Sequence, residues 1–372
     1  MKILYTATVL SHICQFHLPY LQMLKEQGHE VHVAAHDNLA EKNGLRLQYT
    51  DKFTEIPFAR SPASTSNIKA YKKLRKLIDA ERYDTIVCNT PMGGIVTRLA
   101  AKKARRNGTK VIYMAHGFHF YKGASKKAWL MYYPVERYMA RYCDVLVTIN
   151  EEDYALAKAK FRNTNVEHIH GVGVRTDRYH PASAEELTAM RAAEGLSGED
   201  FAILCTGELN ANKDQKTLIS AAAKLRDKIP GLKVLLAGNG PLENELREQI
   251  RNLGLEDTVK LLGYRTDLEK VVPATDVVVS CSRREGLPLN IVEAMLCEKP
   301  VIAAINRGHN ELIKDGVNGY LFAPGDADKL AKKIVKLTEN RTLSGKMGRA
   351  GYEKAQAYTV DAVKHEIENA VL

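Results

Sequence analysis

The sequence contains no run of about 18 consecutive apolar residues, the length that a helix needs to cross a bilayer. We therefore predict no membrane-spanning helix. The apolar start of the chain is interrupted by His12, Gln15 and His17, so we expect a first strand and helix there rather than a signal peptide. The sequence also has no complete G-x-G-x-x-G pattern, which disfavours a dinucleotide cofactor.

The cysteines form no C-x-x-C pair, which disfavours a zinc site. Most of them lie in apolar runs, as small buried residues do. We expect unpaired, buried thiols in a reducing compartment. The six positions are Cys14, Cys88, Cys143, Cys205, Cys281 and Cys297.

The length and the charge distribution are informative. A chain of 372 residues, with 45% hydrophobic and 26% charged residues, suggests two globular domains of ordinary size. Residues 1–180 carry a net charge of +12, whereas the remainder carries −2. This asymmetry predicts an anionic partner for the first half, such as a membrane surface, a lipid diphosphate or a nucleic acid.

The first half alternates strand and helix patterns, as in a doubly wound α/β sheet that binds ligands at the carboxyl ends of its strands. Residues 8–15, after the first strand, are expected to form a loop, and Ser11 and His12 are its ligand candidates. His116 follows another strand and precedes a glycine, with His119 as the alternative. A histidine here binds either a ligand or a backbone carbonyl. The predicted strands are 2–7, 31–35, 85–89, 110–115 and 144–149, and a helix is predicted over 16–27.

Residues 67–82 form a predicted helix with six Lys and Arg residues and an interleaved apolar stripe. Either the stripe packs on the protein and the charges are solvated, or the helix lies at a membrane surface.

The second half repeats the alternation from residue 201. Lys213 lies in the loop after the first of these strands, Gly238 lies in a G-x-G-P turn, and Arg265 follows the third strand. Glycine allows a backbone to approach a ligand, although a plain tight turn explains Gly238 equally well. Asp326 is expected to cap a helix. The predicted strands are 201–206, 233–237, 259–262, 277–279, 301–304 and 319–322, and residues 329–372 are expected to be helical.

Two glutamates eight positions apart flank a predicted helix start. Glu285 follows the strand 277–279, and the helix is predicted to begin near Pro288, because proline suits a first helical turn. The unpaired amides of that turn favour an anion such as phosphate. Glu293 lies further along the same helix, where its carboxylate can accept hydrogen bonds from two neighbouring hydroxyls of a sugar. The alternative is a capped surface helix.

Together these segments resemble the retaining glycosyltransferases of family 4. Glu285 and Glu293 are similar to the family's E-x7-E signature, and residues 207–213 are similar to its G-x-L-x-x-x-K segment. The resemblance implies the GT-B fold: two Rossmann-like, doubly wound α/β domains that face each other across a cleft. We place the domains at residues 1–175 and 176–355, with a C-terminal helix, 356–372, that crosses back to the first domain.

The resemblance also implies roles for residues. Glu285 and His116 would contact the donor sugar, Lys213 would neutralise the diphosphate, and Glu293 would hold the ribose. The sequence departs from the family at Glu208, where an arginine is usual, and in the first loop, which lacks a Gly-Gly pair. The other substrate-binding candidates are Gly286, Leu287, Leu289, Asn290, Gly238, Arg265, Ser11 and His12.

The implied activity is of the hexosyltransferase type. It would move a hexose or N-acetylhexosamine, with retained configuration, from a nucleotide sugar, expected to be UDP-linked. The expected acceptor is a glycan or a polyprenyl-diphosphate-linked glycan in exopolysaccharide or capsule synthesis. We expect no metal and no nucleic acid partner, and a cytoplasmic location that includes peripheral binding to the inner face of the plasma membrane through the basic first domain.

Two other functions are compatible with parts of the sequence. One is a sugar-nucleotide 2-epimerase, which has the same fold but would need acid and base carboxylates in the first domain. The other is a non-enzymatic protein that uses the basic half to bind anionic membranes or nucleic acid. Stabilisation by UDP favours either enzyme, whereas salt-dependent nucleic acid binding without any effect of UDP favours the binding protein.

Overall fold

The computed structural model describes residues 1–41, 44–161 and 164–372. The chain divides into two compact units. The first comprises Met1–Gly173 and Val360–Leu372, and the second comprises Val174–Thr359. The sequence had suggested boundaries at 175 and 355.

The described part of the first unit contains a sheet of seven parallel strands in the order β3-β2-β1-β4-β5-β6-β7. This is the Rossmann order, and its switch point lies between β1 and β4, where the chain changes direction across the sheet. The strands are β1 (Lys2–Val9), β2 (Glu30–His36), β3 (Lys52–Glu55), β4 (Thr85–Asn89), β5 (Lys110–Ala115), β6 (Val145–Thr148) and β7 (Asn165–His168).

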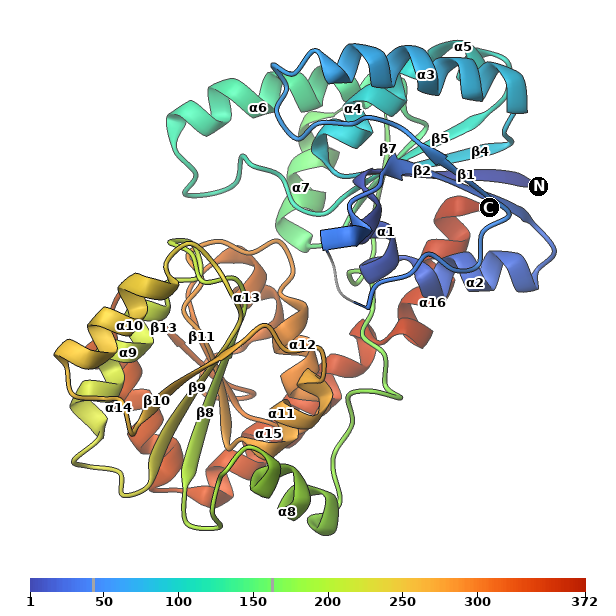
Figure 1. Ribbon diagram of the computed structural model, residues 1–372. Helices are drawn as coiled ribbons and strands as arrows, with labels where there is room; N and C mark the ends of the chain where they lie inside the picture. The colour runs from blue at the N-terminus through green and yellow to red at the C-terminus, as the bar shows by residue number, and fades with distance from the viewer. Residues whose placement is uncertain (42–43, 162–163) are drawn as a thin grey trace. The chain divides into compact units, whose positions relative to one another are not determined.

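Helices cover both faces of this sheet: α3, α4 and α6 lie on one face, and α1, α2 and α16 lie on the other (Figure 1). The apolar core on the first of these faces joins α3 and α4 to the buried residues of β4 and β5. The helices are α1 (Leu10–Phe16), α2 (Leu18–Glu26), α3 (Ser66–Glu81), α4 (Pro91–Ala100), α5 (Lys102–Arg106), α6 (Lys126–Met139), α7 (Glu151–Lys160) and α16 (Val360–Val371), with short 3-10 turns at Leu39–Glu41 and Ala140–Tyr142.

The expected loop at residues 8–15 is wrong. Strand β1 continues to Val9, and α1 begins at the next residue. Leu10, Ile13 and Cys14 are buried at helical spacing, a pattern that the polar residues between them conceal. Because β1 is followed directly by α1, this segment contains no loop in which the family's Gly-Gly pair could lie.

Residues 174–359, all of which are described, form a sheet of six parallel strands in the order β10-β9-β8-β11-β12-β13. The Rossmann order recurs, with the switch point between β8 and β11. The strands are β8 (Phe201–Thr206), β9 (Leu232–Ala237), β10 (Val259–Gly263), β11 (Val277–Ser280), β12 (Val301–Ala304) and β13 (Tyr320–Phe322).

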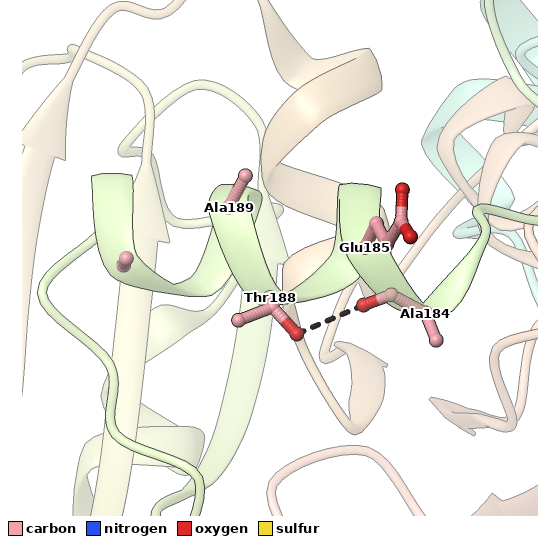
Figure 2. A pocket seen from close by; sticks show the side chains of 5 residues that line it. Ala184, Glu185, Thr188 and Ala189 are labelled. Atoms are coloured by element: carbon pink, nitrogen blue, oxygen red, sulfur yellow. Dashed lines mark hydrogen bonds between the residues drawn. The ribbon is translucent and has the colours of Figure 1, made fainter.

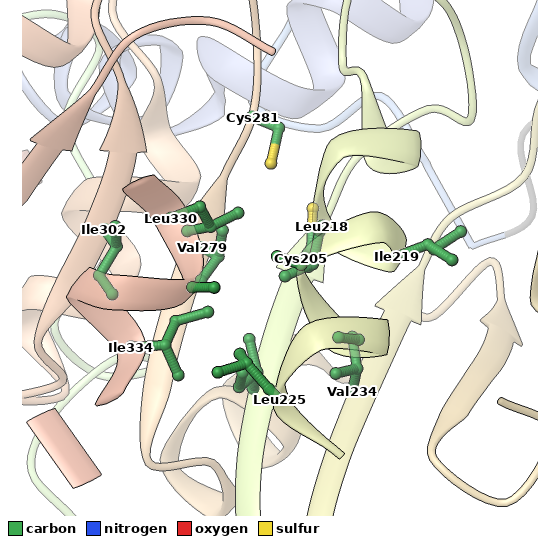
Figure 3. Close-up of a cluster of buried hydrophobic side chains, with 14 of the residues drawn as sticks. Cys205, Leu218, Ile219, Leu225, Val234, Val279, Cys281, Ile302, Leu330 and Ile334 are labelled. Atoms are coloured by element: carbon green, nitrogen blue, oxygen red, sulfur yellow. The ribbon is translucent and has the colours of Figure 1, made fainter. Parts of the chain in front are cut away.

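The core of this second unit is a continuous apolar cluster between the sheet and the helices α9, α10, α14 and α15. Leu218 and Leu225 of α9 and Ile334 of α14 pack against Val279 and Cys205 of the strands (Figure 3). The helices are α8 (Ala184–Ala193), α9 (Gln215–Leu225), α10 (Glu243–Asn252), α11 (Leu268–Ala274), α12 (Leu289–Leu296), α13 (Arg307–Leu312), α14 (Ala327–Thr338) and α15 (Arg341–Ala355), with a 3-10 turn at Gln356–Tyr358.

The C-terminal helix α16 belongs to the first unit. The ring of His170 and its backbone N–H lie 2.7 and 2.8 Å from the Glu366 carboxylate. The chain passes between the units at 173–174 and again at 359–360. These two segments are hydrogen-bonded, since the Val174 N–H donates to Tyr358 O at 2.9 Å. A Cβ at Gly173 would lie 2.6 Å from Cα of Val360, so only glycine fits there.

Several other expectations are confirmed. All six cysteines are free and buried. Asp326 caps α14, accepting from the Lys329 N–H at 2.8 Å. Helix α3 buries Ala70, Leu74 and Ile78, so its apolar stripe packs on the protein. No helix among the described residues is long and apolar enough to cross a membrane.

Candidate functional site

Lys213 and Glu285 meet at the switch point of the second sheet. Lys213 follows β8, Glu285 follows β11, and these strands are neighbours. Nζ of Lys213 lies 2.6 Å from Oε1 of Glu285, and the side chains are only 22% and 15% exposed. The sequence predicted both residues as candidates, and the structure brings them together as a mostly buried ion pair at the place where such sheets bind ligands.

The loop after β8 is folded so that Lys213 points back over its own start. Oδ1 of Asn210 accepts hydrogen bonds from the N–H groups of Asn212 and Lys213, both at 3.0 Å. Gly207 has φ +136°, and a Cβ there would lie 3.0 Å from Cε of Lys213. Glycine at 207 therefore leaves room for the lysine stem.

Gly238 packs against Gly207, the first residue of the same loop. A Cβ at this position would lie 2.0 Å from the carbonyl oxygen of Gly207. The structure thus places Gly238 in a close backbone packing of two turns.

Glu285 leads into the start of α12 through Gly286 and the buried Leu287. Pro288 is the N-cap rather than a residue of the first turn, and no side chain of a described residue caps this end. Amides of the first turn, at Leu289 and Asn290, thus belong to an uncapped helix start that suits an anion. The side chain of Asn290 donates to Oγ1 of Thr206 at 3.1 Å and so ties α12 to β8.

Glu293 lies on α12 in a desolvated position. Burial raises its pKa to about 7, against the opposing effects of the Arg178 charge and a hydrogen bond with Tyr179. Arg178 is itself paired with Glu269, with Nη2 and Oε2 2.7 Å apart. A carboxylate so poorly solvated favours any ligand that offers it hydroxyl donors.

Two nearby cations are used in other pairs: Arg265, a candidate from the sequence, and Arg283, which lies two positions before Glu285. The Arg265 guanidinium donates two hydrogen bonds to Glu194 and two to Asp267. Arg283 is paired with Asp214 at 2.8 Å. Lys213, rather than Arg265 or Arg283, is therefore the cation paired with the Glu285 carboxylate.

A second cluster lies at the switch point of the first sheet. His12 of α1, Asn89 at the end of β4 and His116 after β5 converge there. Nε2 of His116 lies 3.2 Å from Nε2 of His12 and 3.1 Å from Oδ1 of Asn89. Burial lowers the pKa of His116 to about 4 and holds the pKa of His12 well below its usual value, so both rings are neutral at pH 7.

His17 completes the cluster from the junction of α1 and α2, where it precedes the first turn of the second helix. Both ring nitrogens of His17 are buried without a hydrogen-bond partner among the described residues. His12, His17 and His116 each bring a ring nitrogen within 4.8 Å of the others, an arrangement that neutral imidazoles use to bind metals or polar ligands. Ser11 is occupied elsewhere: its N–H donates to Asn38 at 3.0 Å.

Comparison with known proteins places this geometry in a family. Residues 2–150 match the family described as glycosyl transferase 4-like, and residues 188–354 match glycosyl transferases group 1. The protein EpsD of Bacillus subtilis (strain 168), which carries the name of a glycosyltransferase, is 44% identical over 359 residues, covering 96% of this chain and 93% of EpsD. The chain belongs to glycosyltransferase family 4.

Two further relatives agree with this assignment. The UDP-Gal:alpha-D-GlcNAc-diphosphoundecaprenol alpha-1,3-galactosyltransferase of Escherichia coli is 25% identical over 344 residues, covering 90% of this chain and 87% of that enzyme. The crystal structure of HepE from Anabaena in complex with UDP and glucose has a TM-score of 0.80 at 24% identity, covering 99% and 98% of the two chains. The fold of this glycosyltransferase is thus GT-B, and the protein is a hexosyltransferase-type enzyme of polysaccharide or glycoconjugate synthesis.

Three neighbours of Glu285 in this glycosyltransferase were not found from the sequence. Nε of Arg307 donates to the Glu285 carbonyl at 3.2 Å, and a Cβ at Gly308 would lie 2.9 Å from the Glu285 Cβ. Nε2 of His309 is buried without a partner among the described residues, and burial lowers the pKa of this ring to about 4. All three follow β12, the neighbour of β11, so their position at a strand end was the signal available.

Helix α8 of this glycosyltransferase lines a surface hollow that includes none of the candidate site residues described above (Figure 2). The hydroxyl of Thr188 is used within the helix, donating to Ala184 O at 2.8 Å. Apart from Glu185, the lining side chains are small, so we assign this hollow no substrate. It is lined by Ala184, Glu185, Thr188, Ala189 and Ala192.

Proposed function

We propose that this glycosyltransferase transfers a hexose or N-acetylhexosamine from a UDP-sugar, with retention of configuration. The acceptor would be a glycan or a polyprenyl-diphosphate-linked glycan of a surface polysaccharide. The observation that carries the proposal is the Lys213–Glu285 pair at the switch point beside the uncapped start of α12. The names of the relatives support the donor and acceptor classes, since one includes UDP-Gal and a diphosphoundecaprenol-linked sugar, and HepE was crystallised with UDP.

The pair suggests how the donor enters. In the structure, Lys213 neutralises Glu285. A diphosphate carries more negative charge than a carboxylate, so it would attract the Lys213 ammonium group away from Glu285. The amides at the start of α12 would bind the same diphosphate. Glu285 would then be left to accept hydrogen bonds from sugar hydroxyls, and the positive groups would stabilise the departing UDP.

The remaining roles follow the resemblance. Glu293 would accept the two ribose hydroxyls, and His116 would contact the donor sugar as a neutral imidazole. His116 has a partner in Asn89 that orients its ring. Arg265 has no part in this proposal, because its guanidinium is already held by two carboxylates.

We further propose that the reaction needs no metal. Lys213 and the helix amides supply the positive charge that a divalent cation would otherwise bring to the diphosphate. We also propose a cytoplasmic enzyme that binds peripherally to the inner face of the plasma membrane, where a polyprenyl-linked acceptor would be found.

The test is a screen of UDP-sugars with and without an acceptor extract of membrane lipids, in buffer containing a chelator. We expect one UDP-sugar to release UDP only when acceptor lipid is present, with an unchanged rate in the chelator. Release of UDP without acceptor, accompanied by a changed sugar, would indicate the 2-epimerase instead. If no UDP-sugar reacts and none stabilises the protein to heat, the proposed donor is wrong.

A further inference from the structure

Helix α6 turns a set of large apolar side chains toward solvent. Leu130 is 81% exposed, and Met131, Tyr132, Val135 and Tyr138 are 41–51% exposed. The described residues include thirteen exposed large hydrophobic side chains, and five of these lie within the nine consecutive positions 130–138. Exposed apolar side chains gathered in this way mark an interaction surface.

The opposite side of α6 is firmly anchored, so the exposed side chains stay outward. Glu136 is buried and binds Arg98 of α4, with Oε2 and Nη2 3.0 Å apart. The Arg98 guanidinium also stacks 3.8 Å from the centre of the Tyr113 ring. Tyr133 packs against Phe120 with ring centres 5.4 Å apart.

The exposed side of α6 is bordered by cations. Residues 126–142 contain four Lys and Arg residues, Lys126, Lys127, Arg137 and Arg141, and Glu136 as their only carboxylate. Because Glu136 is buried against Arg98, the outward surface carries positive charge alone. Lys102 of α5 adds to it, with Nζ 4.4 Å from the centre of the Tyr142 ring.

The spacing joins the two kinds of side chain into one surface. Steps of three and four residues place Lys127, Leu130, Pro134, Tyr138 and Arg141 in one row, and Met131 and Val135 lie beside it. We call this surface the α6 face: Leu130, Met131, Pro134, Val135 and Tyr138 with the flanking cations. Apolar and aromatic residues bordered by Lys and Arg are typical of helices that lie in the headgroup region of a bilayer.

We propose that the α6 face binds the surface of an anionic phospholipid bilayer. Its apolar side chains enter the acyl boundary, and its cations bind lipid phosphates. The inference rests on the proposed function, since a polyprenyl-linked acceptor is held in such a bilayer. Helix α3 has as many cations but exposes a single large apolar residue, Ile68 at 58%, so it adds long-range attraction without insertion.

Binding to vesicles of phosphatidylglycerol and phosphatidylcholine, measured by flotation, tests the proposal. We expect the wild-type protein to float with these vesicles and not with pure phosphatidylcholine. Leu130→Asp should weaken binding at least about tenfold, since it places a charge where an apolar side chain enters the acyl boundary. The matched control Ile68→Asp on α3 should bind like the wild type.

Charge reversal gives a second pair of variants. Lys126→Glu with Lys127→Glu should weaken binding more than Lys72→Glu with Lys73→Glu on α3, which carries the same change of net charge. Each variant is also tested for stabilisation by UDP. Unchanged stabilisation shows that the nucleotide site is intact, so the donor proposal and the membrane proposal fail separately.

Two outcomes would overturn the proposal. One is that Leu130→Asp and Ile68→Asp bind vesicles equally well. The other is that sedimentation shows a dimer that Leu130→Asp dissociates while vesicle binding is unchanged, which would assign the α6 face to a second copy of the chain.

Discussion

Glu293 shows how a single residue links protein stability to ligand binding. Its pKa is raised to about 7 because the carboxyl group is desolvated on α12. Near neutral pH the group is therefore partly protonated, whereas the proposed pair of ribose hydroxyls would be accepted best by the ionised carboxylate, which has only acceptor atoms. Under the proposed ribose role, nucleotide binding would release a proton from the molecules in which Glu293 is protonated.

We predict that the affinity for the UDP-sugar rises by up to about tenfold per pH unit below pH 7 and levels off by pH 8. A UDP-sugar is the right ligand, because its diphosphodiester has no proton to lose in this range. Glu293→Gln should bind more weakly and without this pH dependence. Calorimetric titrations at pH 6, 7 and 8 measure both, and parallel profiles for the two proteins would contradict the ribose assignment.

The same carboxyl should destabilise the free protein at high pH. Its pKa is higher in the folded than in the unfolded chain, so its contribution to stability is full below about pH 4.5 and is lost as the pH rises through 7. We predict that Glu293→Gln is more stable than the wild type at pH 8, by about 1–3 kcal/mol, with the difference shrinking toward pH 5. Urea unfolding at the two pH values measures it. A variant less stable than wild type at pH 8 would argue against the desolvation.

At the scale of elements, the candidate site depends on how closely two loops and a helix pack. The loop after β11 carries Glu285, and α13 begins directly against it at Arg307 and Gly308. A Cβ at Gly308 would lie 2.9 Å from both the Glu285 Cβ and the Gly286 carbonyl oxygen, so Glu285 must shift if one is added.

We predict that Gly308→Ala lowers kcat/KM about tenfold or more while the fold is kept, since small displacements of a positioned group are costly. The matched control is Gly345→Ala in α15, where an added Cβ meets no atom within 4 Å. That control should be as active as the wild type and slightly more stable, because alanine favours a helix over glycine. Equal kinetics for both variants would show that the position of Glu285 is not critical.

Helix α6 depends on the buried pair of Arg98 and Glu136. Arg98 is fully buried, and removing it leaves Glu136 as an uncompensated charge. We predict that Arg98→Met costs about 3–5 kcal/mol of unfolding free energy, and that adding Glu136→Gln recovers part of this loss. Denaturant unfolding of the two variants measures the coupling, and strictly additive losses would contradict it.

At the scale of the whole molecule, the chain contains two Rossmann units with the same strand order, each with a polar cluster at its switch point. Most of this could be predicted from the sequence. Buried parallel strands are short apolar runs, and Glu285, Lys213 and His116 each follow one. These residues could be predicted because each lies close in sequence to its strand and has a side chain that can bind a ligand.

The missed features depend on tertiary contacts. Helix α1 was missed because burial of Leu10, Ile13 and Cys14 is hidden by polar neighbours. Arg265 looked available in the sequence, yet its partner Glu194 lies 71 positions away. His309 and Arg307 reach Glu285 only because β11 and β12 are adjacent in the sheet. Spacing alone indicates none of these pairings.

The proposed function depends on Lys213 and the start of α12 binding the diphosphate of a nucleotide. Calorimetric binding of UDP tests it most directly, with Lys213→Met compared against Lys216→Met on α9, an exposed lysine paired with Glu245. We predict that the wild type and Lys216→Met bind UDP equally, and that Lys213→Met binds about 10- to 100-fold more weakly. Equal affinity of Lys213→Met and the wild type, or no binding of UDP by either, would rule out this diphosphate site.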